Sequence, residues 1–192
     1  MKNKTLLISL FIVVAFMQLF VPAKMILTQE SILKTGTAFK FKTTPIDPSD
    51  PFRGKYIDLN FEENKFKIQN KKDWVLNEDI YVLIENNNQG FAVIKDVVKE
   101  KPSSEINFIK AKVQYIQSYK TIKNITIEYP FQRFYMEESK AKEAENLHRE
   151  ALKNEYTTTY ALVYLKNGEA VLKNVFINNT PIQDAVMHHQ NN

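Results

Sequence analysis

The 192-residue chain holds 44% apolar and 12% aromatic residues, enough to build a hydrophobic core and unlike a disordered chain. It has no cysteine, which excludes disulfides, thiol nucleophiles and cysteine-ligated metal sites. Of the net charge of +4, Lys2, Lys4 and Lys24 supply three positive charges, so the remainder of the chain is nearly neutral. This balance argues against nucleic acid as a partner, because binding phosphates requires a basic surface.

The N-terminal segment, residues 1–27, is predicted to be a membrane anchor. An apolar run extends from Leu6 to Val21 and resumes after Lys24. About 20 apolar residues are needed to cross roughly 30 Å of hydrocarbon, and this run suffices if Lys24 extends its side chain to the interface. The lysines before the run favour a cytoplasmic N-terminus, with the bulk of the chain on the periplasmic side of the cell (inner) membrane.

A cleaved signal peptide is the alternative for this segment. Val21-Pro22-Ala23 resembles a cleavage site, because small residues stand at its first and third positions. The apolar run from Leu6 slightly exceeds the usual signal core of about 7–15 residues, which favours the uncleaved anchor. Under either interpretation the body of the protein is exported.

After a polar stalk over residues 28–38, a β-rich domain is predicted over residues 39–185. The predicted strands, several of them with alternating apolar and polar residues, cover 39–42, 56–61, 80–84, 91–94, 107–117, 125–129, 160–165 and 170–172. Asn86–Gly90 and Asn167-Gly168 stand between strands and contain residues that accept positive φ in hairpin turns. We therefore expect a mainly β (β-rich α+β) fold of antiparallel hairpins.

One short surface helix is predicted over Lys140–Lys153, where apolar residues recur three and four apart. Glu145 and Arg149 are spaced as an i,i+4 ion pair, and His148 is predicted to pack beside the apolar face. The last residues, 186–192, are predicted to be a disordered tail, where the two histidines are poorly placed to form a metal site. The sequence indicates neither a metal nor a cofactor.

Two stretches of the chain resemble each other. Gly90–Val97 matches Gly168–Val175 at a separation of 78 residues, and Tyr56 with its preceding Pro-Phe pair matches Tyr135 with its own at a separation of 79. Asp58 aligns with Glu137. These matches favour two pseudo-repeated lobes related by a pseudo-twofold axis, although β-hairpins can also converge on similar strings.

The most specific motif is Pro45–Phe61. Its three closely spaced prolines restrict the backbone, and the carboxylates of Asp47 and Asp50 can accept local hydrogen bonds. We expect a rigid loop that brings Arg53 and Gly54 to the start of a strand.

This motif resembles that of the GDYXXLXY family of membrane-anchored bacterial proteins. Gly54, Tyr56 and Leu59 match the Gly-Asp-Tyr-x-x-Leu-x-Tyr string, whereas Lys55 replaces its Asp and Phe61 its last Tyr. Further on, the family's Arg-Tyr-Phe-x-x-Glu stretch is similar to the segment that carries Arg133, Tyr135 and Glu137. The resemblance covers nearly the whole chain. It implies a single N-terminal helix, no established activity and association with multi-pass membrane proteins.

The function expected from these features is a non-enzymatic accessory domain that binds a multi-pass membrane protein. Its interface would comprise the loop residues Asp47, Asp50 and Arg53 and the tyrosine-bearing strands. One alternative is a module that binds an envelope lipid or peptide between the two lobes. Another is a hydrolase that uses Asp47, Asp50 or Asp58, but no nucleophile elbow, phosphate loop or zinc-protease motif accompanies these carboxylates.

Overall fold

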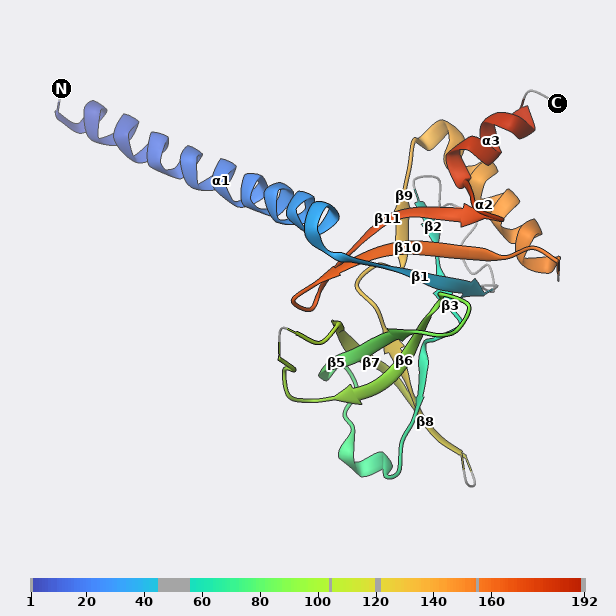
Figure 1. Cartoon of the computed structure of the whole chain (residues 1–192). Coiled ribbons are helices and arrows are strands. Elements are labelled where there is room, and N and C mark those ends of the chain that lie inside the picture. The colour runs from blue at the N-terminus through green and yellow to red at the C-terminus, as the bar shows by residue number, and fades with distance from the viewer. Residues whose placement is uncertain (1, 45–55, 104, 120–121, 155, 191–192) are drawn as a thin grey trace.

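The computed structural model describes residues 2–44, 56–103, 105–119, 122–154 and 156–190. A long N-terminal helix projects from a β-rich domain that carries two further helices (Figure 1). The predicted β-rich α+β class is confirmed.

The helix α1 (Lys2–Thr35) includes the predicted anchor and most of the predicted stalk. Its part from Leu6 to Thr35 is long and apolar enough to cross a membrane, and none of its most apolar stretch is buried by the described part of the chain. The helix ends at Gly36, whose N–H donates to the carbonyl oxygen of Ile32 over 2.8 Å. A side chain at Gly36 would overlap the carbonyl oxygens of Ile32 and Leu165, so the close approach of α1 to the domain requires glycine here.

Two five-stranded antiparallel sheets form the domain. The order of the first sheet is β12 (Thr180–Pro181), β11 (Glu169–Ile177), β10 (Thr159–Lys166), β1 (Thr37–Thr44) and β3 (Asn60–Phe61). The order of the second is β4 (Lys65–Lys67), β8 (Ile122–Glu128), β7 (Phe108–Tyr119), β5 (Asp79–Asn86) and β6 (Ala92–Val98). A separate pair joins β2 (Tyr56–Asp58) to β9 (Arg133–Tyr135), and a 3-10 turn, η1, spans Lys71–Asp73.

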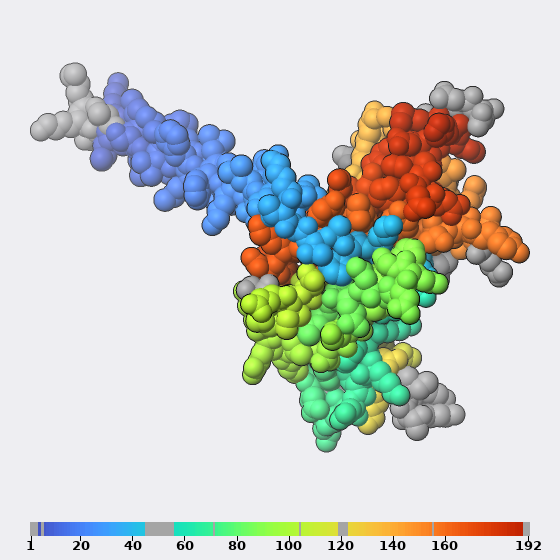
Figure 2. Space-filling model, viewed as in Figure 1, coloured from blue at the N-terminus to red at the C-terminus, as the bar shows by residue number. Residues whose placement is uncertain are grey.

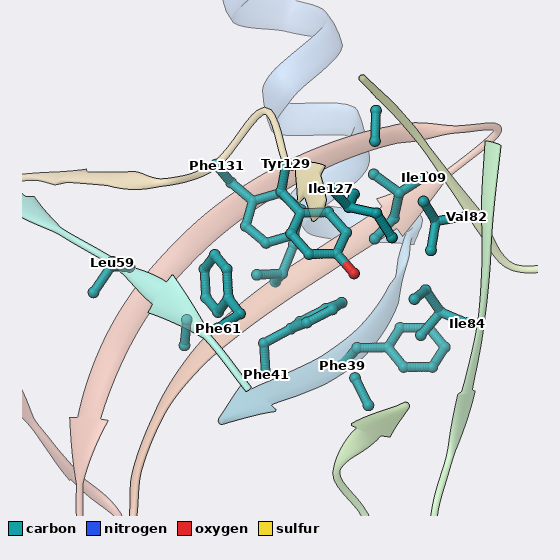
Figure 3. Close-up of a cluster of buried hydrophobic side chains, with 14 of the residues drawn as sticks. Phe39, Phe41, Leu59, Phe61, Val82, Ile84, Ile109, Ile127, Tyr129 and Phe131 are labelled. Carbon is teal, nitrogen blue, oxygen red and sulfur yellow. The ribbon is translucent and has the colours of Figure 1, made fainter. Parts of the chain in front are cut away.

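The two five-stranded sheets share one hydrophobic core, because the alternation of their strands turns an apolar face of each inward. At its centre, Phe41 of β1 and Phe61 of β3 contact Tyr129 and Phe131, with ring centroids between 5.2 and 5.8 Å apart (Figure 3). These rings fill the centre of the domain and hold the two sheets together.

The predicted helix is confirmed as α2 (Glu138–Lys153), with Ala141, Ala144 and His148 buried on one face. The prediction of a disordered tail from residue 186 is wrong as far as Gln190, because α3 (Ile182–Gln190) is helical. Ile182 and Val186, spaced i,i+4, are fully buried, and α3 packs against α2 and β11.

The single strand predicted over residues 56–61 is divided in the structure. Residues 56–58 pair with β9, while Asn60 and Phe61 pair with β1 in the first sheet. Between them, the N–H of Leu59 donates to the carbonyl oxygen of Gln132 over 2.7 Å. The alternation of apolar residues continues through the break, so the pattern alone could not reveal the change of partner.

The predicted turns are confirmed. Asn167 and Gly168 both have positive φ, 53° and 90°, in the β10–β11 hairpin, as a two-residue turn of type I′ requires. In the β5–β6 hairpin the side-chain oxygen of Asn87 accepts the N–H groups of Gln89 and Phe91 over 2.9 and 3.0 Å. Gly90, with φ 79°, completes this longer turn.

The two hairpins share an irregularity at corresponding positions of the predicted repeat. In the β5–β6 pair, Leu83 lies opposite Asp96 but Ile84 lies opposite Ile94, so Lys95 is an extra residue in β6. Such an extra residue is a β-bulge.

The β10–β11 hairpin repeats this pairing. Leu162 lies opposite Asn174 and Val163 lies opposite Leu172, so Lys173 is the extra residue of β11. Lys95 and Lys173 are aligned in the predicted repeat.

The hydrogen bonds beside the bulges also correspond. The N–H of Val97 donates to Oδ1 of Asp96 over 2.8 Å. In the same way, the N–H of Val175 donates to Oδ1 of Asn174 over 2.8 Å. These side chains satisfy N–H groups next to each bulge.

The strands around these hairpins follow the same order. β11, β10 and β1 are successive neighbours in one sheet, as β6, β5 and β7 are in the other. Strand β1, which precedes the β5–β6 hairpin in the sequence, pairs with β10 of the other hairpin. Strand β7, which precedes the β10–β11 hairpin, pairs with β5 of the first hairpin. This exchange interlocks the halves into one domain instead of two separate lobes.

Candidate interaction surface

The short pair β2–β9 brings together the two tyrosine-bearing segments of the sequence. Tyr56 lies opposite Tyr135 and Asp58 lies opposite Arg133. Between them, Ile57 and the opposing Phe134 are buried in the core. Since side chains alternate along a strand, burial of the middle residues directs the flanking four away from the core.

The aromatic rings and the guanidinium group on the outer face are in contact. The ring centroids of Tyr56 and Tyr135 are 5.4 Å apart, and the Cζ atom of Arg133 lies 5.0 Å from the centroid of the Tyr56 ring. A cation–π contact at an exposed site contributes about 0.5–1 kcal/mol, which favours this position of the arginine. We call Tyr56, Arg133 and Tyr135 the tyrosine–arginine face.

Asp58 borders this face. Its Oδ1 atom is 3.8 Å from Nε of Arg133, and the side chain of Arg133 is 56% exposed. An ion pair this long and this exposed adds little to stability.

Tyr135 is well exposed to solvent, with 65% of its surface accessible. A tyrosine ring offers a large apolar area with few rotatable bonds, which makes it well suited to protein recognition. The tyrosine–arginine face therefore combines two residue types that often dominate binding energy at interfaces.

Two other predicted site residues have structural roles. Leu59 is buried in the core. Glu137 immediately precedes α2, and its backbone carbonyl oxygen accepts the N–H groups of Lys140 and Ala141. The Lys140 ammonium group, 2.8 Å away, and the Ser139 hydroxyl group hold the pKa of the Glu137 carboxyl below its ordinary value.

The other four predicted site residues, Asp47, Asp50, Arg53 and Gly54, lie outside the described residues. The rigid loop predicted for them stays a prediction. The chain re-enters the described part at Tyr56, so this loop leads directly into the tyrosine–arginine face.

A buried polar cluster joins α2 to the first sheet. His148, predicted to pack, is buried, and its Nε2 atom is hydrogen-bonded to Oγ1 of Thr43 over 3.1 Å. Thr43 donates in turn to Oγ1 of Thr159 over 2.7 Å. Burial lowers the pKa of His148 to about 4, so the imidazole is neutral at pH 7. The sequence offered one clue that Thr43 is buried. It follows Phe41 by two residues in a strand, so both side chains face the same side of the sheet.

Metal binding has no evident site in the described ranges. There, no three residues among histidines, aspartates and glutamates are grouped as ligands.

A family model confirms the resemblance carried by the Pro45–Phe61 motif. The model of the GDYXXLXY protein family matches residues 18–175 of this chain. The chain belongs to the GDYXXLXY family. The match begins within α1 and ends in β11, so it covers the segments that form the end of α1, both hairpins and the β2–β9 pair in this GDYXXLXY protein. Searches of curated proteins and of solved structures each found no match.

Proposed function

We propose that this GDYXXLXY protein is a membrane-anchored, non-enzymatic accessory subunit whose extracytoplasmic domain binds a multi-pass membrane protein. The tyrosine–arginine face is the contact surface. The observation that carries the proposal is the exposed Tyr135 ring packed beside Tyr56, over which Arg133 lies. Tyrosine and arginine are enriched among the residues that contribute most to binding at interfaces.

The rigidity of this face favours binding. Ile57 and Phe134 fix the backbone of both strands from within the core, and the aromatic and cation–π contacts restrict the side chains. Little conformational entropy is then lost when a partner covers them, which improves affinity for a given contact area.

The anchor explains why the partner would be a membrane protein. With the N-terminus in the cytoplasm and α1 across the membrane, the domain lies at the periplasmic surface. There its effective concentration toward other membrane proteins is raised by the shared membrane. A modest interface is sufficient under these conditions.

Two other functions have less support. A lipid or peptide between the lobes would have to displace the rings of Phe41, Phe61 and Phe131, which fill the centre of the domain (Figure 3). A hydrolase would require a carboxylate free to accept a proton, whereas Asp58 lies beside Arg133.

Co-purification from native membranes tests the proposal. Full-length tagged protein would be mildly crosslinked and its partners identified by mass spectrometry. We expect a stoichiometric multi-pass protein with the native chain and its loss with Arg133→Glu. Arg149→Glu is the matched control, since it also reverses the cation of a partly exposed ion pair, 3.1 Å from Glu145 on α2.

A second pair of variants tests the aromatic contribution. Tyr135→Ala is expected to reduce the recovered partner strongly, whereas Tyr115→Ala, which truncates a tyrosine of similar exposure on β7, should not. Equal recovery with Arg133→Glu, Tyr135→Ala and both controls would disprove the tyrosine–arginine face as the contact surface.

A further inference from the structure

A groove of about 610 Å³ lies where α1 meets the β10–β11 turn. Figure 2 shows this junction, with the blue end of α1 beside the orange turn. Apolar side chains of α1, among them Phe20, Ala23 and Leu27, form one wall. Lys24, Lys166 and Glu169 also line the groove, so two ammonium groups and one carboxylate give it an excess of positive charge.

Lys166 is fixed against the helix. Its Nζ atom donates to Oγ1 of Thr35 over 2.6 Å and lies 3.4 Å from Oγ of Ser31. These hydroxyl groups are one helical turn apart and hold the ammonium group of a sheet residue next to α1. A cation held in place in this way loses less entropy when it binds an anion.

The groove lies at the level of the lipid headgroups if α1 crosses the membrane, which is the part of the proposed function on which this inference rests. A helix rises 1.5 Å per residue, so about 20 residues span the hydrocarbon. Counted from Leu6, that length ends near Met25. The wall formed by Phe20 and Leu27 therefore extends across the outer boundary of the hydrocarbon, where acyl chains meet headgroups.

We propose that this groove binds an anionic phospholipid. The acyl chains lie along Phe20, Ala23 and Leu27, and the phosphate is bound by the ammonium groups of Lys24 and Lys166. A soluble phosphate ion would not use the apolar wall, which continues directly into the membrane-spanning part of α1. A lipid uses both the apolar and the cationic parts of the groove. The bound lipid would fix the domain relative to the membrane surface.

The test uses the purified full-length protein alone, so its result is independent of any protein partner. The protein is reconstituted into bilayers with equal amounts of phosphatidylcholine and phosphatidylglycerol and then extracted in mild detergent. The lipids that stay bound are counted by native mass spectrometry. We expect the bound lipid to be enriched in phosphatidylglycerol over phosphatidylcholine. This enrichment should fall about fivefold for each lysine replaced.

Lys24→Gln is the first variant, because Lys24 lies on the exposed surface of α1 and its change leaves the Lys166 contacts intact. Lys24→Gln/Lys166→Gln should abolish the enrichment. Lys34→Gln is the control, since Lys34 lies on the same helix but pairs with Glu30 over 2.9 Å. Equal retention of the two lipids by the native protein would overturn the proposal. So would undiminished enrichment in Lys24→Gln.

The apolar wall is tested by filling it. Ala23→Phe should displace the bound lipid, whereas Ile26→Phe, an addition to an exposed position of α1 that does not line the groove, should not. If Ala23→Phe retains as much phosphatidylglycerol as Ile26→Phe, the groove is not the binding site. Membrane insertion of every variant is checked by its resistance to alkaline extraction, which separates loss of the lipid from loss of the anchor.

Discussion

Tyr56 and Tyr135 lie directly opposite each other in the β2–β9 pair, with 5.4 Å between their ring centroids. The same two residues are aligned in the internal repeat. A local twofold axis through an antiparallel pair of strands places a residue opposite its own counterpart in the other repeat. Together with the bulges at Lys95 and Lys173, this supports an origin of the domain by duplication. The proposed interaction surface then lies where the two halves meet.

The two faces of β9 are expected to respond differently to truncation. Phe134→Ala should lower the free energy of unfolding by about 3 kcal/mol, because it leaves a cavity in the core. Tyr135→Ala should cost only about 1 kcal/mol, the value of an exposed aromatic pair. Urea unfolding of the full chain in mild detergent, followed by the fluorescence of Trp74, the only tryptophan, measures both. A larger cost for Tyr135→Ala would mean that Tyr135 is needed for the fold.

His148 is expected to make the domain sensitive to acid. Its pKa is lowered from 6.5 to about 4 by burial, so below pH 6.5 the unfolded chain binds a proton that the folded chain does not. The contribution of His148 to stability is complete above pH 6.5. It declines as the pH falls toward 4, by at most about 3 kcal/mol.

His148→Gln isolates this effect, because glutamine can retain a hydrogen bond to Thr43 but does not titrate. The difference in unfolding free energy between the native chain and the variant, measured from pH 7.5 to 4, should change in favour of the variant as the pH falls. Carboxyl groups such as Glu137 contribute equally to both proteins. A constant difference across this range would show that folding does not lower the pKa of His148.

The two turn glycines offer a second matched comparison. Both have positive φ, so alanine at either position is strained by about 1 kcal/mol. A Cβ atom at Gly168 would also overlap the ring of Phe108, whereas space around Gly90 is open. We expect Gly168→Ala to cost about 3 kcal/mol and Gly90→Ala about 1 kcal/mol in thermal or urea unfolding. Equal costs would indicate that β7 does not approach the β10–β11 turn this closely.

The corresponding bulges predict how each hairpin tolerates a deletion. Deletion of Lys95 removes the bulge but leaves Val97 facing the core, because Ile94 and Val97 lie opposite Ile84 and Val82, which share one face of β5. We therefore expect a loss of less than about 1 kcal/mol in unfolding free energy. Deletion of Asn88 shortens only the β5–β6 turn and should also cost less than about 1 kcal/mol. A loss of about 3 kcal/mol for the Lys95 deletion would mean that the deletion turns Val97 out of the core.

Local patterns in the sequence determined much of the fold. Alternation in segments such as Phe39–Lys42 identified strands, Asn167-Gly168 identified a hairpin, and the spacing of Ala141 and Ala144 identified the buried face of α2. The apolar run after Leu6 identified the long helix α1. Each of these signals depends on residues close in sequence, where backbone preference and side-chain periodicity are decisive.

The tertiary structure decided what depends on distant residues. The helix α3 was missed because a terminal segment of nine residues is not stable alone and becomes helical by packing Ile182 and Val186 into the core. The strand predicted over residues 56–61 is divided because its two ends pair with different strands. Tyr56 and Tyr135 were recognised individually, but their contact depends on the pairing of β2 with β9. Periodicity shows which side of a strand is buried, whereas its partner is chosen by the packing of the whole core.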